Sequence, residues 1–357
     1  MNIRPLVFVA VLLSSACESS PDKSAQETPV DAAPRPMADG WSFVDARAPA
    51  GQAPPPAILH VEVALDRLGF SSGVIDGKAT RFDNLALRGF QEANGLSQTG
   101  KLDEPTKAAI GKAMKDAPTR VVSIPAAFAQ GPFQPDLPKS TAEQAKYEHL
   151  GYRNLMEALA ERFHTTPELL RALNSPTTKM GAGAVIRVPN VAEANPAKLV
   201  EDERGWNKTL VTLGVSPAQP QAARIVVDKS EGALRAYDEQ GRLLLLAPAT
   251  MGSEHDPLPI GNWTIQGVSR NPDFHYNPEL FWDVSDSKKS EILNPGPNGP
   301  VGVAWLDLSK PHYGIHGTAE PTSIGISESH GCVRLTNWDA ARLAQMVKPG
   351  VKVVFQA

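Results

Sequence analysis

The spacing of apolar residues changes about two thirds of the way along the chain. In the first part, apolar residues recur every three or four positions, as in Ile58, Val61, Leu65 and Leu68, and this period is typical of amphipathic helices. From Ala222 on, apolar and polar residues alternate around KSEG and DEQG turns, which predicts strands joined in hairpins. The pattern therefore predicts a multidomain chain, with helical modules first and a mostly-β domain over residues 222–357.

Two helical modules are predicted. Residues 57–113 contain three helical segments, and Asp83 and Gly95 are expected to cap and to end the second of them. Residues 144–191 have the pattern of a helix, a turn, a helix and a short strand, and Thr166 before Pro167 marks the start of the second helix. His164 between these helices is expected to be a surface residue rather than a ligand.

The remaining segments predict connections and a targeting sequence. Residues 18–56 are rich in Ser, Pro and Ala and predict a disordered tether, while residues 114–143 and 192–221 are interpreted as a connector and a linker. Residues 1–17 contain an apolar run, LVFVAVLL, that is too short to span a bilayer, and the run is followed by small residues. This order predicts a signal peptide, so that the mature protein works outside the cytoplasm.

The end of the signal peptide resembles the lipobox of bacterial lipoproteins, because Ala16 precedes Cys17. In that family the cysteine is lipidated, which implies a periplasmic protein anchored to a membrane through Cys17. Ser14 stands where the lipobox has a large aliphatic residue, and ordinary cleavage without lipidation remains the alternative. The net charge of −4 over 357 residues argues against a nucleic-acid partner, since such proteins carry an excess of basic residues.

Cys332 is the candidate for chemistry. The chain has two cysteines, and if Cys17 is lipidated or removed, Cys332 has no intramolecular partner. His312, His316 and His330 lie near it in the sequence, which leaves three interpretations: a buried thiol, a zinc site or a nucleophile. The nucleophile is favoured, because a histidine can take the proton of a thiol and return it to a leaving amine.

The motifs IHGT and SHGCVRL resemble the signature of YkuD-type L,D-transpeptidases, and PIGNWTI, NPGPNGPVG and LSKPHYGIHGT extend the resemblance over most of residues 222–357. It implies a β-sandwich-like catalytic domain that needs no metal or organic cofactor. This chain departs from the family pattern at Leu258, which replaces a threonine before Pro259, and at Arg334, where some members have asparagine.

The resemblance also implies roles for individual residues. Cys332 would be the nucleophile, His316 the general base and proton donor, and the backbone carbonyl of Gly317 would orient His316. His330 and Gly331 would shape the oxyanion hole. The residues expected to contact substrate are Arg334, Tyr313 and Ser329, with a structural ion pair as the alternative for Arg334. Phe281, Trp282 and Trp305 are expected either to form a substrate groove or to pack in the core.

The two helical modules have resemblances of their own. RLGF, LRGFQEANGL and TGKLDEPT make residues 57–113 similar to the three-helix peptidoglycan-binding domain. AERFHTTPELLRALN and GAGAVIRVPN make residues 144–191 resemble a LysM module, a family that binds N-acetylglucosamine-containing glycans. Both imply that the partner is peptidoglycan, through its glycan and its stem peptides.

The implied reaction is the formation of 3→3 cross-links in peptidoglycan through a thioester on Cys332. A carboxypeptidase or hydrolase of the same fold, including one that attaches lipoprotein to the wall or releases it, is the main alternative. A wall-binding scaffold without catalytic activity is a further one.

Overall fold

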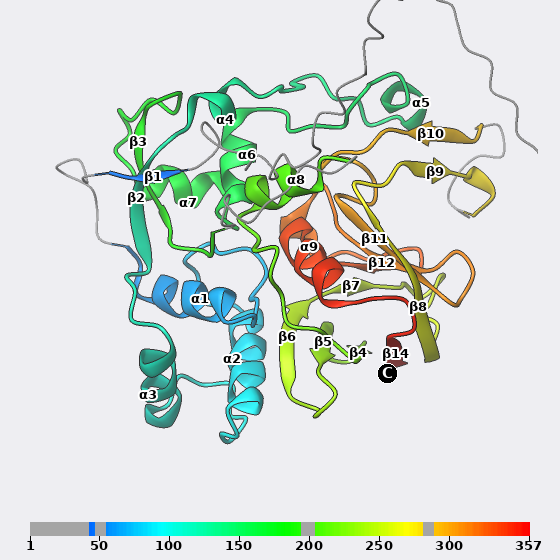
Figure 1. Ribbon diagram of the computed structural model, residues 1–357, viewed down its shortest axis with the longest axis horizontal. Helices are drawn as coiled ribbons and strands as arrows, with labels where there is room; N and C mark the ends of the chain where they lie inside the picture. The colour runs from blue at the N-terminus through cyan, green and yellow to red at the C-terminus, as the bar shows by residue number, and fades with distance from the viewer. Residues whose placement is uncertain (1–42, 47–54, 194–203, 281–288) are drawn as a thin grey trace, which may run out of the picture. The chain divides into compact units, whose positions relative to one another are not determined.

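The computed structural model describes residues 43–46, 55–193, 204–280 and 289–357 (Figure 1). All of these belong to one unit by their contacts. The predicted signal peptide with Cys17, and the aromatic residues Phe281 and Trp282, lie outside the described residues. Within the described ranges, no helix is both long and apolar enough to cross a membrane.

Most helices lie in the first half of the chain. Their bounds are α1 Ala57–Arg67, α2 Arg81–Ala93, α3 Glu104–Ala113, α4 Ala126–Gln130, α5 Thr141–Gln144, α6 Leu155–Arg162, α7 Pro167–Ala172, α8 Trp206–Leu213 and α9 Asn337–Met346, with 3-10 turns η2 Pro278–Leu280 and η3 Pro321–Ser323.

Strands dominate the last third. The bounds of the strands are β1 Val44–Asp45, β2 Thr119–Ser123, β3 Val185–Pro189, β4 Arg224–Asp228, β5 Ala233–Tyr237, β6 Leu243–Pro248, β7 Thr250–Met251, β8 Gly261–Arg270, β9 Phe274–Tyr276, β10 Glu291–Leu293, β11 Ala304–Leu308, β12 Gly314–His316, β13 Val333–Arg334 and β14 Lys352–Gln356.

The three helices predicted over residues 57–113 are confirmed as α1, α2 and α3. The cap of α2 differs in detail from the prediction: Thr80 is the N-cap, and Asp83, three residues on, bonds back to it in a capping box. Thr166 caps α7 with Pro167 at its first position, as predicted.

Part of the predicted tether is ordered. Phe43 is 8% exposed, and its ring packs edge-on against Phe128 and Phe163 at centroid distances of 5.1 and 5.0 Å. Strand β1, which follows Phe43, pairs with β2, and β2 pairs with β3 in a three-stranded antiparallel sheet. The prediction of disorder is therefore wrong for residues 43–46, because composition averaged over the segment hides one apolar anchor.

The predicted linker 192–221 contains helix α8. Its apolar face, formed by Trp206, Leu210 and Leu213, is buried in the same core as the strands of the last third. Gly205 and Gly214, both at left-handed φ, bound the helix. The linker prediction is thus wrong for residues 206–213, because the helix is short and its burial depends on the sheet behind it.

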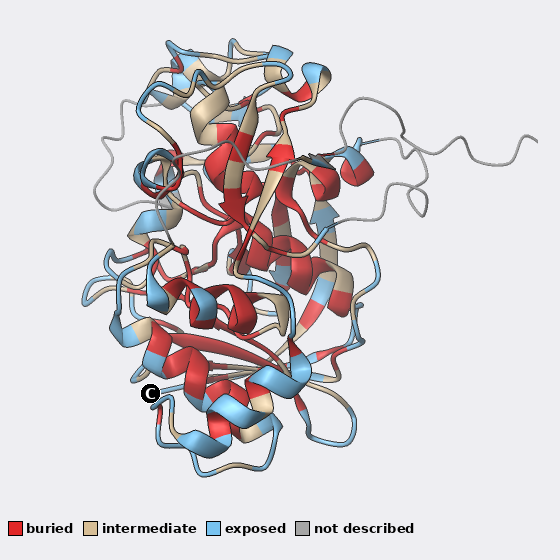
Figure 2. Ribbon diagram, turned by 90° about the vertical axis from the view of Figure 1, so that its left-hand side faces the viewer, coloured by how far each residue is buried: buried red, intermediate tan, exposed pale blue. Residues whose placement is uncertain are grey.

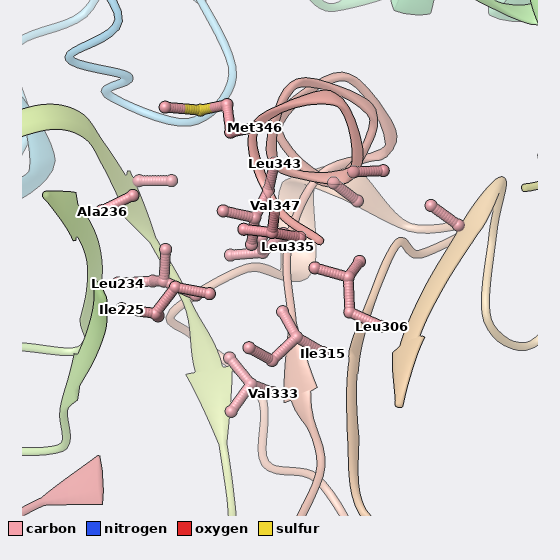
Figure 3. Packing of buried hydrophobic residues seen from close by; sticks show 14 of the residues in the cluster. Ile225, Leu234, Ala236, Leu306, Ile315, Val333, Leu335, Leu343, Met346 and Val347 are labelled. Atoms are coloured by element: carbon pink, nitrogen blue, oxygen red, sulfur yellow. The ribbon is translucent and has the colours of Figure 1, made fainter. Parts of the chain in front are cut away.

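The last third forms a mixed nine-stranded sheet in the order β6-β5-β4-β14-β8-β11-β12-β13-β7. Strand β8 joins the two halves of this sheet, which are β6-β5-β4-β14 on one side of β8 and β11-β12-β13-β7 on the other. Its residues Gly261–Thr264 pair with β14, whereas Ile265–Arg270 pair with β11. Figure 3 shows Leu335 and residues at the end of α9 between side chains of the two halves. The mostly-β prediction is confirmed, and α9 fills the space that the bent sheet leaves.

The helical module before the sheet covers one of its edges. Phe70 forms a parallel bridge with Leu246 of β6. The N–H of Ser71 donates to the Leu246 carbonyl at 2.8 Å, and the N–H of Leu246 donates to the Gly69 carbonyl at 3.0 Å. Leu246 also belongs to the buried cluster of α1 and α2. Figure 2 shows that buried residues line the strands and the inner faces of these helices. Edge strand β6 is therefore protected from pairing with another chain.

His164 corrects a further prediction. Its side chain is fully buried and stacks on the Trp338 ring of α9 at 4.9 Å. Nδ1 faces the carboxylate of Asp66 at 3.1 Å, and Nε2 faces the carbonyl oxygen of Leu213 at 2.7 Å. The expectation of a surface position is wrong, because the partners of His164 come from segments about 50 to 175 residues away in the chain.

Candidate active site

Cys332 lies in the loop that enters β13, directly after Gly331. The φ of Gly331 is +94°, and a Cβ there would meet Tyr313 Cε1 at 2.5 Å. Glycine is thus required twice, by the backbone conformation and by the ring that lies over it. The Cys332 thiol is partly exposed and donates to the backbone carbonyl of His312 at 3.8 Å. The loop and the ring of Tyr313 therefore hold the thiol above β12.

Strand pairing brings His316 and Arg334 together. β12 and β13 are parallel, and His316 is the register partner of Arg334. On the other side of β12, Trp305 of β11 is the register partner of His316, and the two rings stack at 5.5 Å. Partners in register present their side chains on the same face of a sheet. His316 thus lies between an aromatic ring and a cation, next to the loop that carries Cys332.

The backbone of Gly317 sets the orientation and tautomer of His316. The imidazole is 5% exposed, and Nδ1 lies 2.7 Å from the Gly317 carbonyl oxygen. A carbonyl only accepts hydrogen bonds, so Nδ1 carries the proton and Nε2 keeps its lone pair. Burial and then the Arg334 cation lower the pKa of His316 to about 3, although the Gly317 carbonyl acts in the opposite direction. At neutral pH the imidazole is therefore a neutral base.

The thiol is also neutral at rest. Burial raises the pKa of Cys332, while the Gly314 N–H and the Arg334 cation offset part of that rise. The site is therefore a thiol beside a neutral imidazole rather than a preformed ion pair. Such a pair acts by general-base catalysis, in which the proton leaves the thiol as the sulfur attacks.

Arg334 is placed to meet an anion. Its guanidinium donates to the Glu328 carbonyl oxygen at 3.2 Å. Among the described residues, no Asp or Glu carboxylate forms an ion pair with it, so the structural ion pair considered from the sequence is not seen. Burial lowers the pKa of Arg334, and the nearby thiolate form of Cys332 would raise it. This cation is thus available to a substrate carboxylate.

Ser329 and Tyr313 differ in what they contact. The Ser329 hydroxyl donates to the Cys332 carbonyl at 2.6 Å and accepts from the Gly252 N–H at 2.7 Å, and the residue is 4% exposed. Ser329 therefore holds the loop that carries Cys332, and its predicted contact with substrate gains no support. Tyr313 is half-buried beside the thiol, and burial raises its pKa, with Cys332 and Asp256 adding to the rise. His330 is partly exposed in the same loop.

The zinc alternative gains no support from the side-chain positions. Within the described ranges, no group of three or more His, Cys, Asp or Glu side chains is arranged to hold a metal ion. His312 lies at left-handed φ of +68° before β12, while the side chain of His316 is directed at Gly317. The arrangement thus favours the nucleophile among the three interpretations of Cys332.

Comparison with known families gives two matches that cover different modules. Residues 222–355 match the YkuD family, described as "L,D-transpeptidase catalytic domain". Residues 55–110 match the family described as "Putative peptidoglycan binding domain". A relative, "Putative L,D-transpeptidase YkuD" of Bacillus licheniformis, is 34% identical over 161 residues, which are 45% of this chain and 81% of that protein.

The chain belongs to the L,D-transpeptidase family. It is therefore an enzyme of this type, with a helical peptidoglycan-binding domain before the catalytic domain. "Probable L,D-transpeptidase YbiS" of Escherichia coli is 28% identical over 172 residues, 46% of this chain and 55% of that protein. A solved L,D-transpeptidase structure from Xylanimonas cellulosilytica is 15% identical, with a TM-score of 0.34 over 87% of this chain and all of that one.

The structure brings together residues that the sequence motifs left separate. Cys332, His316, Gly317 and Arg334 meet at β12 and β13, as the family motif implies. The stacking of Trp305 on His316 was not predicted, because the sequence left this tryptophan between a groove and the core. Asn337, described below, was not singled out at all. The sequence carries no signal for it, because a polar residue after the Thr336 helix cap is ordinary and the burial of Asn337 depends on the fold.

Proposed function

We propose that this L,D-transpeptidase forms 3→3 cross-links between peptidoglycan stem peptides through a thioester on Cys332. The observation that carries the proposal is the 2.7 Å contact between His316 Nδ1 and the Gly317 carbonyl. It leaves Nε2 unprotonated, on the same sheet face as Arg334 and beside the thiol loop. An imidazole in this state has a free lone pair with which to accept the thiol proton.

In the first step, Nε2 of His316 takes the thiol proton while the sulfur attacks the carbonyl carbon between the third stem residue and the terminal D-alanine. Backbone N–H groups at His330, Gly331 and Cys332 are proposed to stabilise the oxyanion. The C–N bond then breaks, and the imidazolium returns its proton to the leaving D-alanine amine. The product is a thioester, and His316 is again neutral.

In the second step, an amine on a neighbouring stem attacks the thioester carbonyl and loses a proton to His316. Collapse of the intermediate forms the new amide and returns the proton to the Cys332 sulfur. With water in place of the amine, the same steps give a carboxypeptidase. With a lysine of a lipoprotein, they anchor that protein to the wall.

Binding of the polymer is proposed to use three parts of the chain. Arg334 would hold a substrate carboxylate through its planar fork of donors. The peptidoglycan-binding domain and the LysM-like residues 144–191 would each bind glycan weakly, and together they raise the local concentration of stem peptides. We also propose that Cys17 carries a lipid that holds the protein at a membrane facing the periplasm.

Product analysis by mass spectrometry tests the reaction. The chain without residues 1–17 is incubated with disaccharide-tetrapeptide units that contain diaminopimelate, and Cys332→Ala and His316→Gln serve as controls. We expect a cross-linked dimer that has lost one D-alanine, absent with Cys332→Ala and reduced about 10²- to 10⁴-fold with His316→Gln. Acylation of Cys332 by a carbapenem, read as a mass increase, reports the first step alone.

Other products would change the proposal. Tripeptide monomer alone, dependent on Cys332, would mean that water rather than a stem amine accepts the acyl group. If neither product depends on Cys332 and no carbapenem adduct forms, the thioester mechanism is wrong, and the wall-binding scaffold becomes the better interpretation.

A further inference from the structure

Asn337 is buried directly behind the catalytic histidine. It is fully buried at the first position of α9, and the N–H of Leu335, two residues earlier, donates to the His316 carbonyl at 2.8 Å. A Cβ on Gly317 would collide with Asn337 Oδ1, and so would a Cβ on Gly302. The amide oxygen thus packs against the peptide whose carbonyl orients His316.

The amide of Asn337 can adopt only one orientation. Oδ1 accepts from the Val303 N–H at 3.2 Å, whereas Nδ2 donates to Glu161 Oε1 at 2.9 Å and to the Pro297 carbonyl oxygen at 3.1 Å. A flipped amide would place its two N–H groups against the Val303 N–H and its oxygen against the Pro297 carbonyl. Three hydrogen bonds in a buried site therefore fix the position of Oδ1 against Gly317.

Glu161 comes from outside the catalytic domain. It lies on α6, before the matched residues 222–355, and is 5% exposed. Its second oxygen accepts from the Tyr152 hydroxyl at 2.8 Å. Burial raises the pKa of Glu161 to about 8, with the Glu157 charge adding to the rise and the bonds from Tyr152 and Asn337 opposing it. The neutral carboxyl can still accept from Asn337, so the tie does not require a charge.

We propose that Glu161 and Asn337 are positioning residues for His316, so that the module before the catalytic domain holds the general base in place. Glu161 fixes the Asn337 amide, Asn337 fixes the peptide at Gly317, and the Gly317 carbonyl orients the imidazole. This inference rests on the proposed role of His316 as the base. It makes the upstream module part of the catalytic apparatus, in addition to any binding of glycan.

The test compares Glu161→Leu with Glu157→Leu in the full chain. Glu157 is a matched control, because it lies on the same helix and also accepts from a buried asparagine amide, Asn298 at 3.2 Å, which does not contact Gly317. We expect Glu161→Leu to lower kcat about 10- to 100-fold with KM changed less than about twofold, since misplacing a catalytic group affects the chemical step. Glu157→Leu should keep kcat within about twofold.

Proton NMR of the His316 Nδ1–H signal provides a readout that needs no substrate, and His316→Gln assigns it. The signal should be lost or shifted in Glu161→Leu and kept in Glu157→Leu. An unchanged signal, with kcat equal to that of Glu157→Leu, would overturn the proposal. If the wild-type chain makes no Cys332-dependent product, the proposed function fails, whereas the NMR comparison still decides the positioning.

Exchanging donor and acceptor tests the pair itself and covers the case in which Glu161→Leu does not fold. Asn337→Asp replaces the donor Nδ2 with an oxygen that faces the Glu161 carboxyl and the Pro297 carbonyl, and it should lower kcat about 10- to 100-fold. Combining it with Glu161→Gln restores one donor and one acceptor across the contact, and kcat should recover at least about fivefold over Asn337→Asp. Full additivity of the two changes would mean that the contact does not position His316.

Discussion

Two buried carboxyl groups tie the upstream modules to α9, and they do so by opposite means. Asp66 of α1 faces a guanidinium and an imidazole, because Arg342 donates to both of its oxygens at 2.9 Å and His164 lies 3.1 Å away. Burial alone would raise the pKa of Asp66, but Arg342 and His164 hold it well below its usual range. Among the described residues, the hydrogen bonds of Glu161 come from Tyr152 and Asn337, neither of which is a cation, and burial raises its pKa to about 8.

The difference matches how close each tie lies to His316. Asp66 bonds to Arg342, one and a half turns into the helix, and Ser71 bonds to Asp339 nearby at 2.8 Å. Glu161 bonds to Asn337, which touches Gly317. An ionised carboxylate there would favour the protonated imidazole. The ion pair of Asp66 with Arg342 thus connects the modules, whereas the neutral hydrogen bond of Glu161 with Asn337 can position His316 without favouring its protonation.

The largest expected effect comes from breaking the ionic tie. Arg342→Met leaves the buried carboxylates of Asp66 and Asp339 without their cation, so we expect a loss of about 3–5 kcal/mol in the free energy of unfolding in urea. Arg242→Met is the control, because Arg242 is exposed and pairs with Asp238 four residues away; it should cost less than about 1 kcal/mol. Equal losses in the two variants would contradict the comparison.

The neutral tie should appear in the pH dependence of stability. The pKa of Glu161 is raised in the fold, from 4.5 to about 8, so its contribution is complete below pH 4.5 and is lost as pH rises towards 8. Glu161→Gln cannot ionise and should lose less stability than the wild type between pH 5 and 8, by on the order of a few kcal/mol. Parallel curves from thermal unfolding at each pH would show that Glu161 is already charged.

The smallest effect concerns the base itself. Arg334→Gln removes a cation that lowers the pKa of His316, so the pKa should rise and the acid limb of the rate should move to higher pH. Burial is the larger cause and remains, so we expect a shift of less than about one pH unit. Carbapenem acylation measured from about pH 2 to 6 checks this, and the wild-type rate should show no acid limb above pH 5. Identical profiles would mean that Arg334 does not act on His316.

The sequence predicted most of the local structure of the site and little of its support. The short motifs around His316 and Cys332 can be recognised in the sequence alone. The loop conformation and the proposed thiol chemistry both need glycine, histidine and cysteine at fixed spacing. The support was not predictable in this way: Glu161 and Asn337 are separated by 176 residues, and nothing in a local pattern relates them. His164 was assigned to the surface for the same reason.

The sequence by itself determined the order of the modules, most of the strands and helices within them, and the candidates for the nucleophile and the base. These follow from periodicity, capping residues and a short motif, all of which act over a few neighbouring residues. Only the tertiary structure decided the protonation of His316, the neutral state of the thiol and the tie from α6 to the catalytic loop. These depend on burial and on contacts between distant segments, and the free energy of a buried polar group is set by what the fold places around it.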